Sequence, residues 1–252
     1  MRAPVLAGRA FARALTLLPV ADLGGGGRAA FAADPWARVV PERWLASRLE
    51  SLRSPEHLHR LELGGMLHAT LRPYQQVGLQ WLHLLSELGL GACLADDMGL
   101  GKTVQVLALL LAQRLHSKAK RLPSLIVAPA SLLANWTAEI ERFAPSLRVL
   151  VAHTAFMPAA DIERSAKQLS RFDLVITSYG SALRTPLLAK EPWHLLLLDE
   201  AQAIKNPADR QTRAIKSLRA HARIALTGTQ VVNRLFDQWS TFYFLHQALH
   251  RS

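Results

Sequence analysis

Gly91-Ala-Cys-Leu-Ala-Asp-Asp-Met-Gly-Leu-Gly-Lys-Thr-Val-Gln-Val106 is the stretch of this sequence that decides the fold. Its first residues, 91–95, are a short apolar run, which breaks into a glycine turn and then into a segment with apolar residues at helical spacing. Gly99 and Gly101 permit backbone angles that are closed to other residues, so successive N–H groups can turn inward at a helix N-terminus. The stretch therefore predicts a strand, a phosphate-binding loop and a helix.

Two side chains at the start of the predicted helix would complete such a loop. Lys102 adds a positive charge for the outer phosphates, and the hydroxyl of Thr103 is placed to ligate Mg²⁺. The strict pattern G-x-x-x-x-G-K-[ST] has a first glycine where this chain has Asp96. The alternative is a glycine-rich turn with an incidental lysine, and the strand-like and helix-like flanks favour the phosphate loop.

A second chemical landmark is the acidic pair Asp199 and Glu200, which follows the leucine run 195–198. A buried strand that ends in two carboxylates places them where open α/β sheets bind ligands. We expect Asp199 to hold Mg²⁺ through its water shell and Glu200 to orient and polarise an attacking water. An Asp-Glu pair alone is a common surface dipeptide, and the preceding leucine run favours the catalytic interpretation.

Short apolar runs recur between helical segments along the rest of the chain: 125–128, 149–152, 174–177, 195–198 and 224–226. Continuous apolar strands that alternate with helices predict an α/β fold, with a mostly parallel sheet and helices on both faces.

Another helix is predicted behind Pro73, because proline suits a first helical turn. Its buried face is predicted from apolar residues at helical spacing: Val77, Trp81, Leu84, Leu85 and Leu88. Near the helix start, the amide of Gln75 offers both a donor and an acceptor, which makes it a candidate for reading an adenine edge. Exposed glutamines at helix starts are common, so this hypothesis depends on the other motifs.

The composition limits the kinds of binding partner and of cellular compartment that the sequence predicts. The chain has 30 Lys and Arg against 19 Asp and Glu, a net charge of +11, which suits a polyanionic partner such as nucleic acid. A single cysteine, Cys93, excludes an internal disulfide and points to a reducing compartment, and its place in a predicted strand indicates a buried core thiol. The charge-free run 122–138 contains Pro123 and Pro129 and predicts no membrane span.

The chain divides by composition into three parts. Residues 1–35, with four consecutive glycines at 24–27, predict a flexible lead-in. Residues 36–67 predict an accessory segment with a helix at 42–52, and residues 68–252 hold the motifs described above.

In this order, the motifs resemble those of the first RecA-like lobe of Swi/Snf-type ATPases, which are double-stranded-DNA translocases of helicase superfamily 2. The resemblance covers about residues 68–245. Segment 71–75 resembles the adenine-reading element, and segment 96–103 resembles the phosphate loop of this family, which has Asp96 in place of the glycine. The resemblance implies a RecA-like P-loop NTPase lobe with ATP and Mg²⁺ as cofactors. It assigns nucleotide binding to Gln75, Met98, Gly99, Leu100, Gly101, Lys102 and Thr103.

The resemblance also implies a nucleic-acid surface. Segment 125–139 resembles a motif in which Ser131 and the following helix start would contact a DNA phosphate. The residues alone predict an amphipathic helix there with Trp136 in the core, and both interpretations can hold at once. Segment 176–179 resembles a strand-end motif that faces the nucleic acid, which assigns DNA contacts to Thr177 and Tyr179. The implied partner is the phosphate backbone of double-stranded DNA without sequence specificity, and the implied location is cytoplasmic and nucleoid-associated.

Two later segments resemble the catalytic and coupling motifs of the same family. Segment 199–206 matches the metal and water-activating motif in the form with Gln202, and segment 225–229 matches the motif that couples nucleotide to DNA. The catalytic residues would be Lys102, Asp199 and Glu200, and the coupling residues Gln202, Thr227, Gly228 and Thr229. The family usually continues with Pro-Ile-Glu-Asn, whereas residues 230–233 read Gln-Val-Val-Asn, without the proline and the acid.

A second RecA-like lobe, with an arginine finger, is expected to complete the motor in cis or in trans. We therefore expect these residues alone to bind ATP, to hydrolyse it very slowly and not to translocate. Two other classes stay open: a non-catalytic nucleotide- or DNA-binding module, and an unrelated P-loop ATPase such as a transporter subunit. Segments 73–75 and 206–207 disfavour the transporter subunit.

Overall fold

The computed structural model describes residues 61–97, 99–116, 122–228, 240–241 and 243–245. All of them belong to one of the two units of the chain, Arg60–Ser252. The predicted lead-in, the predicted helix at 42–52, Met98 and Thr229 lie outside the described residues, so the predicted domain boundaries stay predictions.

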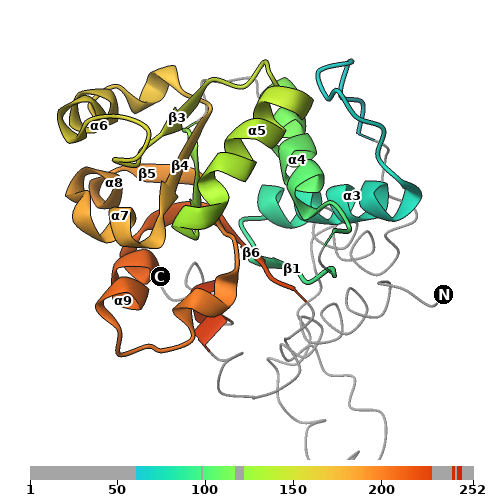
Figure 1. Cartoon of the computed structure of the whole chain (residues 1–252). Coiled ribbons are helices and arrows are strands. Elements are labelled where there is room, and N and C mark those ends of the chain that lie inside the picture. The colour runs from blue at the N-terminus through green and yellow to red at the C-terminus, as the bar shows by residue number, and fades with distance from the viewer. Residues whose placement is uncertain (1–60, 98, 117–121, 229–239, 242, 246–252) are drawn as a thin grey trace, which may run out of the picture. The chain divides into compact units, whose positions relative to one another are not determined.

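Six strands form one sheet in the order β1-β6-β5-β2-β4-β3, and every strand pair in the described part is parallel (Figure 1). The strands are β1 Ala92–Leu94, β2 Ser124–Ala128, β3 Val149–Val151, β4 Leu174–Ser178, β5 Pro192–Leu198 and β6 Arg219–Leu226. Every residue of β2 and β4 is buried, so both faces of the sheet are covered there, as in doubly covered parallel sheets. The predicted α/β fold with a parallel sheet is confirmed.

Two strands begin earlier than the apolar runs predict. β5 begins at Pro192 instead of Leu195, and β6 begins at Arg219 instead of Ile224. Their first residues are partly exposed and include charged and polar side chains, which a search for continuous apolar runs passes over.

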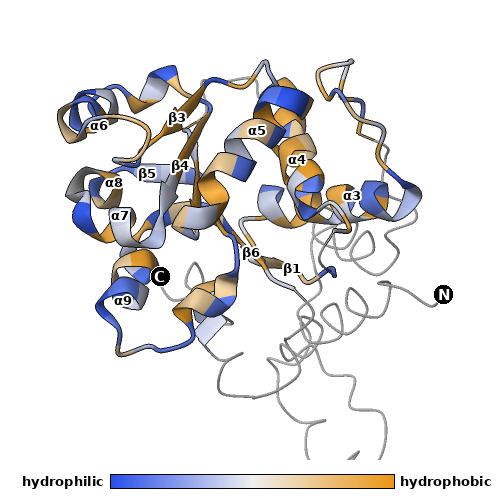
Figure 2. Ribbon diagram, in the orientation of Figure 1, coloured by the Kyte–Doolittle hydropathy of each residue, from blue (hydrophilic) through white to orange (hydrophobic). Residues whose placement is uncertain are grey.

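The helices between the strands are α3 Pro73–Glu87, α4 Lys102–His116, α5 Leu133–Phe143, α6 Ala159–Ala166, α7 Tyr179–Arg184, α8 Pro186–Lys190 and α9 Arg210–Ser217. Three 3₁₀ turns are η3 Ala130–Leu132, η4 Leu169–Arg171 and η5 Ala201–Ile204. α4 packs against both α3 and α5, and α7 packs against α8 and α9. Figure 2 shows apolar residues along β3, β4 and α4, and hydrophilic residues on the outer turns of α6 and α9.

The predicted buried face of α3 is wrong in part. Val77 is 40% exposed and Trp81 is only half-buried, whereas Leu79 and Leu82 are buried. The buried face includes polar Ser86, whose hydroxyl accepts a hydrogen bond of 2.9 Å from Gln113 Nε2 on α4. Hydrophobicity alone misplaces the face, because polar residues on it find partners on α4 and on the glycine loop.

Cys93 lies in β1, as predicted, but it is half-buried instead of fully buried. Burial raises the pKa of this thiol to about 11, so it stays protonated at neutral pH and is a poor nucleophile. None of the helices in the described part of the chain combines the length and the apolar character needed to span a bilayer.

Candidate functional site

The predicted motifs meet at one edge of the sheet, where the carboxyl ends of the parallel strands lie. Asp96 follows β1, Thr227 follows β6, Asp199 follows β5, Ser131 follows β2 and Tyr179 follows β4. These residues are far apart in the sequence, and they share this edge because the paired strands all run in the same direction. This is the edge at which open α/β sheets bind ligands.

The glycine loop has the backbone that the sequence predicts. Gly99 has a φ of +83° and Gly101 a φ of +77°, both in the left-handed region that favours glycine. The helix α4 then begins at Lys102 and runs for 15 residues. Unsatisfied N–H groups and the positive end of a helix dipole therefore face the loop, which suits an anion.

Lys102 is held over the loop. Its Nζ donates hydrogen bonds to the carbonyl oxygens of Asp96 at 2.8 Å and Asp97 at 3.1 Å. Both acceptors are neutral carbonyl groups, and an anion that replaced them would form stronger, charge-assisted hydrogen bonds with the ammonium group.

The start of α3 supports the loop from behind. Gln75 Nε2 donates to the carbonyl oxygen of Leu100 at 2.9 Å, and Tyr74 donates its hydroxyl to the same oxygen at 3.1 Å. Gln75 Oε1 accepts from the backbone N–H of Arg72 at 2.8 Å, and the side chain is buried. Gln75 therefore positions the loop, while its predicted adenine contact stays a prediction.

Asp96, which replaces the first glycine of the strict loop pattern, points into the protein. Its Oδ2 accepts a hydrogen bond of 3.0 Å from Gln105 Nε2 on α4, and both side chains are buried. This bond ties the end of β1 to the helix behind the loop. Sequence reasoning did not single out Gln105 or Tyr74, since their partners are visible only in the fold.

Asp199 is a second buried acid at this edge, only 9% exposed. Its Oδ2 accepts from Trp136 Nε1 at 2.8 Å, and its Oδ1 accepts from the backbone N–H of Glu200 at 3.0 Å. Burial raises the pKa of Asp199 and the charge of Glu200 raises it further, while the two hydrogen bonds and the charge of Lys102 oppose this. A buried carboxylate with a raised pKa gains from a nearby cation, which is the behaviour expected of a metal ligand.

Glu200 has an unusual backbone. Its φ of 49° and ψ of 55° make it the one residue other than glycine with a positive φ in the described part of the chain. Its carboxylate accepts a hydrogen bond from Gln202 Nε2, and Gln202 Oε1 accepts from Thr227 Oγ1 at 3.2 Å. A chain of contacts therefore links Glu200, the predicted water-activating acid, to the predicted coupling residues Gln202 and Thr227. The third of these residues, Gly228, follows Thr227 directly.

The three predicted DNA contacts differ in exposure. Ser131 is exposed in η3. Thr177 is fully buried and donates its hydroxyl to the carbonyl oxygen of Ala152 at 2.8 Å. Tyr179 is buried too, and its hydroxyl donates to the carbonyl oxygen of Asp199 at 2.8 Å. Of these three residues only Ser131 has an exposed side chain, and the predicted contacts by Thr177 and Tyr179 would require their side chains to leave the interior.

Comparison with known proteins decides the family. Residues 74–252 match the SNF2-related domain family. The chain belongs to the SNF2-related domain family. The match confirms the family inferred from the motifs.

Relatives of this SNF2-related domain include bacterial helicases. The chain is 43% identical over 205 residues to YwqA of Bacillus subtilis, which is assigned as an ATP-dependent helicase/translocase, and this covers 81% of the chain and 22% of YwqA. It is 42% identical over 176 residues to an uncharacterized ATP-dependent helicase of Mycoplasma pneumoniae, which covers 70% of the chain and 17% of that protein. The SNF2-related domain thus spans about a fifth of the length of these relatives.

A solved structure supports the RecA-like fold. The SWI2/SNF2 ATPase core of Sulfolobus solfataricus in complex with double-stranded DNA is 40% identical and superposes with a TM-score of 0.68. The match covers 77% of the 252-residue chain and 39% of the archaeal chain. The predicted RecA-like fold is confirmed by this match together with the parallel sheet.

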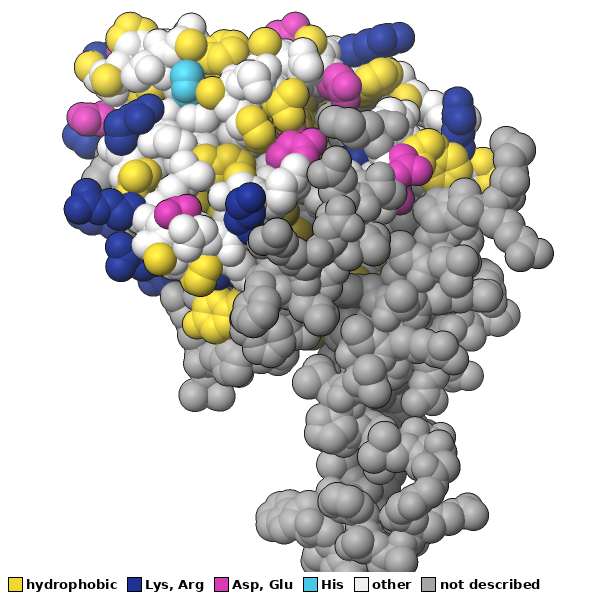
Figure 3. All heavy atoms as spheres, turned by 60° about the horizontal axis from the view of Figure 1, so that its bottom comes forward, with side chains coloured by type: hydrophobic (Ala, Val, Ile, Leu, Met, Phe, Trp, Pro, Cys, Tyr) yellow, Lys and Arg dark blue, Asp and Glu magenta, His cyan; other side chains and the backbone are white. Residues whose placement is uncertain are grey.

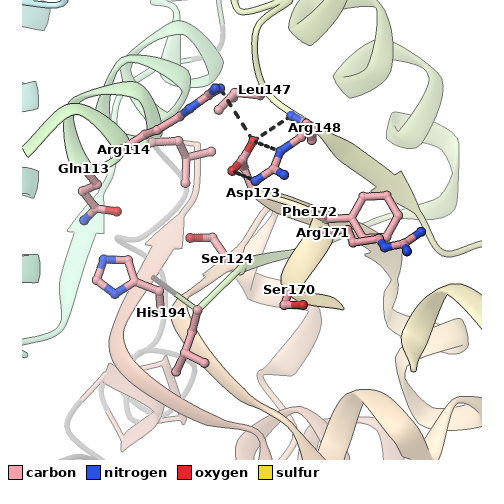
Figure 4. A pocket seen from close by; sticks show the side chains of 12 residues that line it. Gln113, Arg114, Ser124, Leu147, Arg148, Ser170, Arg171, Phe172, Asp173 and His194 are labelled. Carbon is pink, nitrogen blue, oxygen red and sulfur yellow. Dashed lines mark hydrogen bonds and ion pairs between the residues drawn. The ribbon is translucent and has the colours of Figure 1, made fainter. Parts of the chain in front are cut away.

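A cavity of about 530 Å³ lies at the opposite edge of the sheet, where the strands begin (Figure 4). Ser124 at the start of β2 and Asp173 just before β4 line it. Figure 4 shows the guanidinium groups of Arg114 and Arg148 converging on Asp173. Arg148 Nη2 donates to Asp173 Oδ1 at 2.8 Å, its backbone N–H donates to Oδ2 at 2.9 Å, and Arg114 lies 3.6 Å from Oδ2. These contacts join α4 to the starts of β3 and β4, so the cluster has a structural role.

Asp173→Asn is expected to lower the free energy of unfolding at neutral pH by about 1 to 2 kcal/mol, because it removes charge-assisted hydrogen bonds. Burial alone would raise the pKa of Asp173, but the hydrogen bonds from Arg148 and the charges of Arg114 and Arg148 lower it overall. The contribution of Asp173 is therefore present above the usual aspartate range and is lost as the pH falls through the lowered pKa. Urea unfolding at neutral and acidic pH measures both effects.

The matched control is Asp161→Asn. Asp161 pairs at 3.2 Å with Arg164 of its own helix, and the side chains are 43% and 77% exposed. Such surface pairs contribute little, so this variant should unfold like the parent. Equal stabilities of the two variants at neutral pH would contradict the role given to Asp173.

Proposed function

We propose that this SNF2-related domain is the ATP-binding lobe of a DNA-dependent ATPase that moves along double-stranded DNA. One observation supports the proposal most strongly. The glycine loop with Lys102 lies at the same edge of the sheet as the buried acid Asp199, which stands beside Glu200. The archaeal relative with this fold is an ATPase core that was solved on double-stranded DNA.

In the nucleotide-bound state, N–H groups of the loop would surround the phosphates and Lys102 would exchange the carbonyl oxygens of Asp96 and Asp97 for phosphate oxygens. Gln75, beside the loop, would lie near the adenine.

Mg²⁺ fits the donor set, because Thr103 and Asp199 offer hard oxygen ligands. The described residues contain no group of three or more His, Cys, Asp or Glu side chains that could hold a metal, and Mg²⁺ on phosphates needs only one or two protein ligands beside water. When bound, the ion would neutralise charge on the phosphates. Glu200 would orient the attacking water and accept its proton, and its bond with Gln202 would connect this step to Thr227.

Two features support a DNA partner. The net charge is +11, and Figure 3 shows Lys and Arg side chains along the margin on the side of α7, α8 and α9, with acidic side chains scattered singly. Ser131 is exposed at the sheet edge of the nucleotide site. A phosphate-led contact would lose affinity steeply with salt and would not distinguish sequences. In a bacterial cell such a motor would work in the cytoplasm, on the nucleoid.

The 252-residue polypeptide is expected to bind ATP with Mg²⁺ but to hydrolyse it very slowly. A second RecA-like lobe, supplied in cis or in trans, would provide the arginine finger, which is worth about 10³ to 10⁵ in rate in related phosphoryl-transfer systems. Steady-state ATPase rates with and without a separately supplied second lobe, each with and without duplex DNA, test this proposal.

The control is Glu200→Gln, which should bind ATP normally and stay slow when the second lobe is present. Brisk DNA-stimulated hydrolysis by the polypeptide alone would contradict the division of the site between two lobes. A rate that stays at background under every condition would instead assign the chain to the non-catalytic binding modules. The changed segment 230–232 is the observation that favours this second candidate.

A further inference from the structure

Trp136 reaches the acidic pair from a different part of the chain. It lies in the first turn of α5, is 3% exposed, and donates its Nε1–H to Asp199 Oδ2 at 2.8 Å, 63 residues away in the sequence. A buried tryptophan N–H requires a partner, and here the partner is the acid assigned to the metal. The indole is therefore both part of the core and a direct neighbour of the site.

Asp199 is fixed at three points. Trp136 holds Oδ2, the backbone N–H of Glu200 holds Oδ1 at 3.0 Å, and the Tyr179 hydroxyl holds the carbonyl oxygen at 2.8 Å. Each carboxylate oxygen can accept a second hydrogen bond or a ligand. The contacts thus fix the rotamer of Asp199 without using up its capacity to bind.

The same helix begins at the predicted DNA contact. Ser131 is exposed in η3, and α5 follows directly from Leu133. Because a helix moves as a rigid unit, displacement of the start of α5 also displaces the indole of Trp136. The contact between Trp136 and Asp199 thus joins the helix that follows Ser131 to the predicted metal-binding acid.

We propose that Trp136 is a positioning residue for Asp199, through which DNA bound at the start of α5 changes the affinity of the nucleotide site for Mg²⁺. This inference rests on the proposed function, because it takes Asp199 as the metal ligand and Ser131 as the DNA contact.

The test compares two tryptophans that each donate one buried hydrogen bond. Trp193 is fully buried and donates its Nε1–H to the carbonyl oxygen of Leu188 at 3.0 Å, outside the acidic pair. Trp136→Phe and Trp193→Phe therefore remove the same chemical group, and only the first removes it from Asp199. Fluorescence titrations with mant-ATP, in EDTA and at increasing MgCl₂, separate nucleotide binding from its metal dependence.

Trp136→Phe is expected to raise the Mg²⁺ concentration for half-maximal enhancement of mant-ATP binding by about tenfold, as when an outer-shell partner of a metal ligand is removed. Binding in EDTA should be unchanged, and Trp193→Phe should match the parent in both measurements. Adding duplex DNA should shift the Mg²⁺ midpoint in the parent and in Trp193→Phe, but not in Trp136→Phe.

Three results would overturn the inference: equal Mg²⁺ midpoints in Trp136→Phe and Trp193→Phe, no DNA-induced shift in the parent, or a shift of parental size in Trp136→Phe. A parent that binds no mant-ATP at any MgCl₂ concentration would overturn the proposed function as well. If Trp136→Phe does not fold, 3-benzothienylalanine at position 136 replaces it, because this residue keeps the shape of tryptophan and has sulfur in place of the N–H group. Its expected midpoint and the overturning results are the same.

Discussion

Replacing Lys102 with alanine should weaken ATP binding by about 10- to 100-fold, which corresponds to the loss of one charge-assisted contact worth about 1.5 to 3 kcal/mol. The Nζ atom now lies within 3.1 Å of two loop carbonyl oxygens, so it is already at the place where phosphates would enter. An alanine changes no backbone atom of the loop, and it removes the charge together with these two hydrogen bonds. Isothermal titration calorimetry with ATP and MgCl₂ gives the affinities directly.

Lys167→Ala is the matched control, because Lys167 is exposed at the end of α6, and its replacement removes the same charge from the surface. It should bind ATP like the parent, and both variants should keep the parent's melting temperature. An ATP affinity that is the same in Lys102→Ala and in the parent would rule out this loop as the phosphate site.

Replacing Gly101 with alanine should weaken ATP binding at least about tenfold more than replacing Gly99, a difference of about 1.4 kcal/mol. Both glycines have a positive φ, so each alanine carries a backbone cost of about 1 to 2 kcal/mol. At Gly99 an added Cβ would meet nothing within 4 Å, whereas at Gly101 it would lie 2.5 Å from Gln75 Nε2 and 3.1 Å from Val104 Cγ1. Alanine at Gly101 therefore pushes Gln75 off the carbonyl oxygen of Leu100 and displaces the loop.

A double-mutant cycle separates this steric effect from backbone strain. Gln75→Ala removes the side chain that the new Cβ would strike, so the effects of Gly101→Ala and Gln75→Ala on ATP affinity should be less than additive. Gly99→Ala and Gln75→Ala should combine additively, since no atom of Gln75 lies within 4 Å of a Cβ at Gly99. Additivity in both cycles would mean that Gln75 does not support the loop.

Local signals were enough to predict the elements of the site. The backbone of Gly99 and Gly101 follows from the freedom of glycine, and the apolar run before Asp199 places that acid at the end of a buried strand. The strand order and the family confirm that these two motifs belong to one RecA-like fold. Their individual roles in binding and catalysis stay predictions.

The contacts that position these residues could not be predicted in the same way. The pattern of α5 predicts that Trp136 is buried, and this is confirmed, but nothing in the pattern says that its N–H group meets Asp199. Likewise, Thr177 and Tyr179 stand at a strand end, yet their hydroxyls turn inward to carbonyl oxygens of neighbouring segments. Such choices depend on which backbone groups the fold leaves without partners, and these are fixed only when distant strands pair.

The left-handed backbone at Glu200 has an evolutionary consequence. Glycine or asparagine would adopt this conformation at lower cost than glutamate, so the backbone disfavours the acid, and its predicted role in orienting water would be the reason that it is retained. Homologues that no longer need to hydrolyse ATP would therefore replace this glutamate early, while the backbone conformation at this position would stay the same. Among descendants of such a lobe, the amino acid at position 200 would distinguish the proteins that hydrolyse ATP from those that keep only the fold.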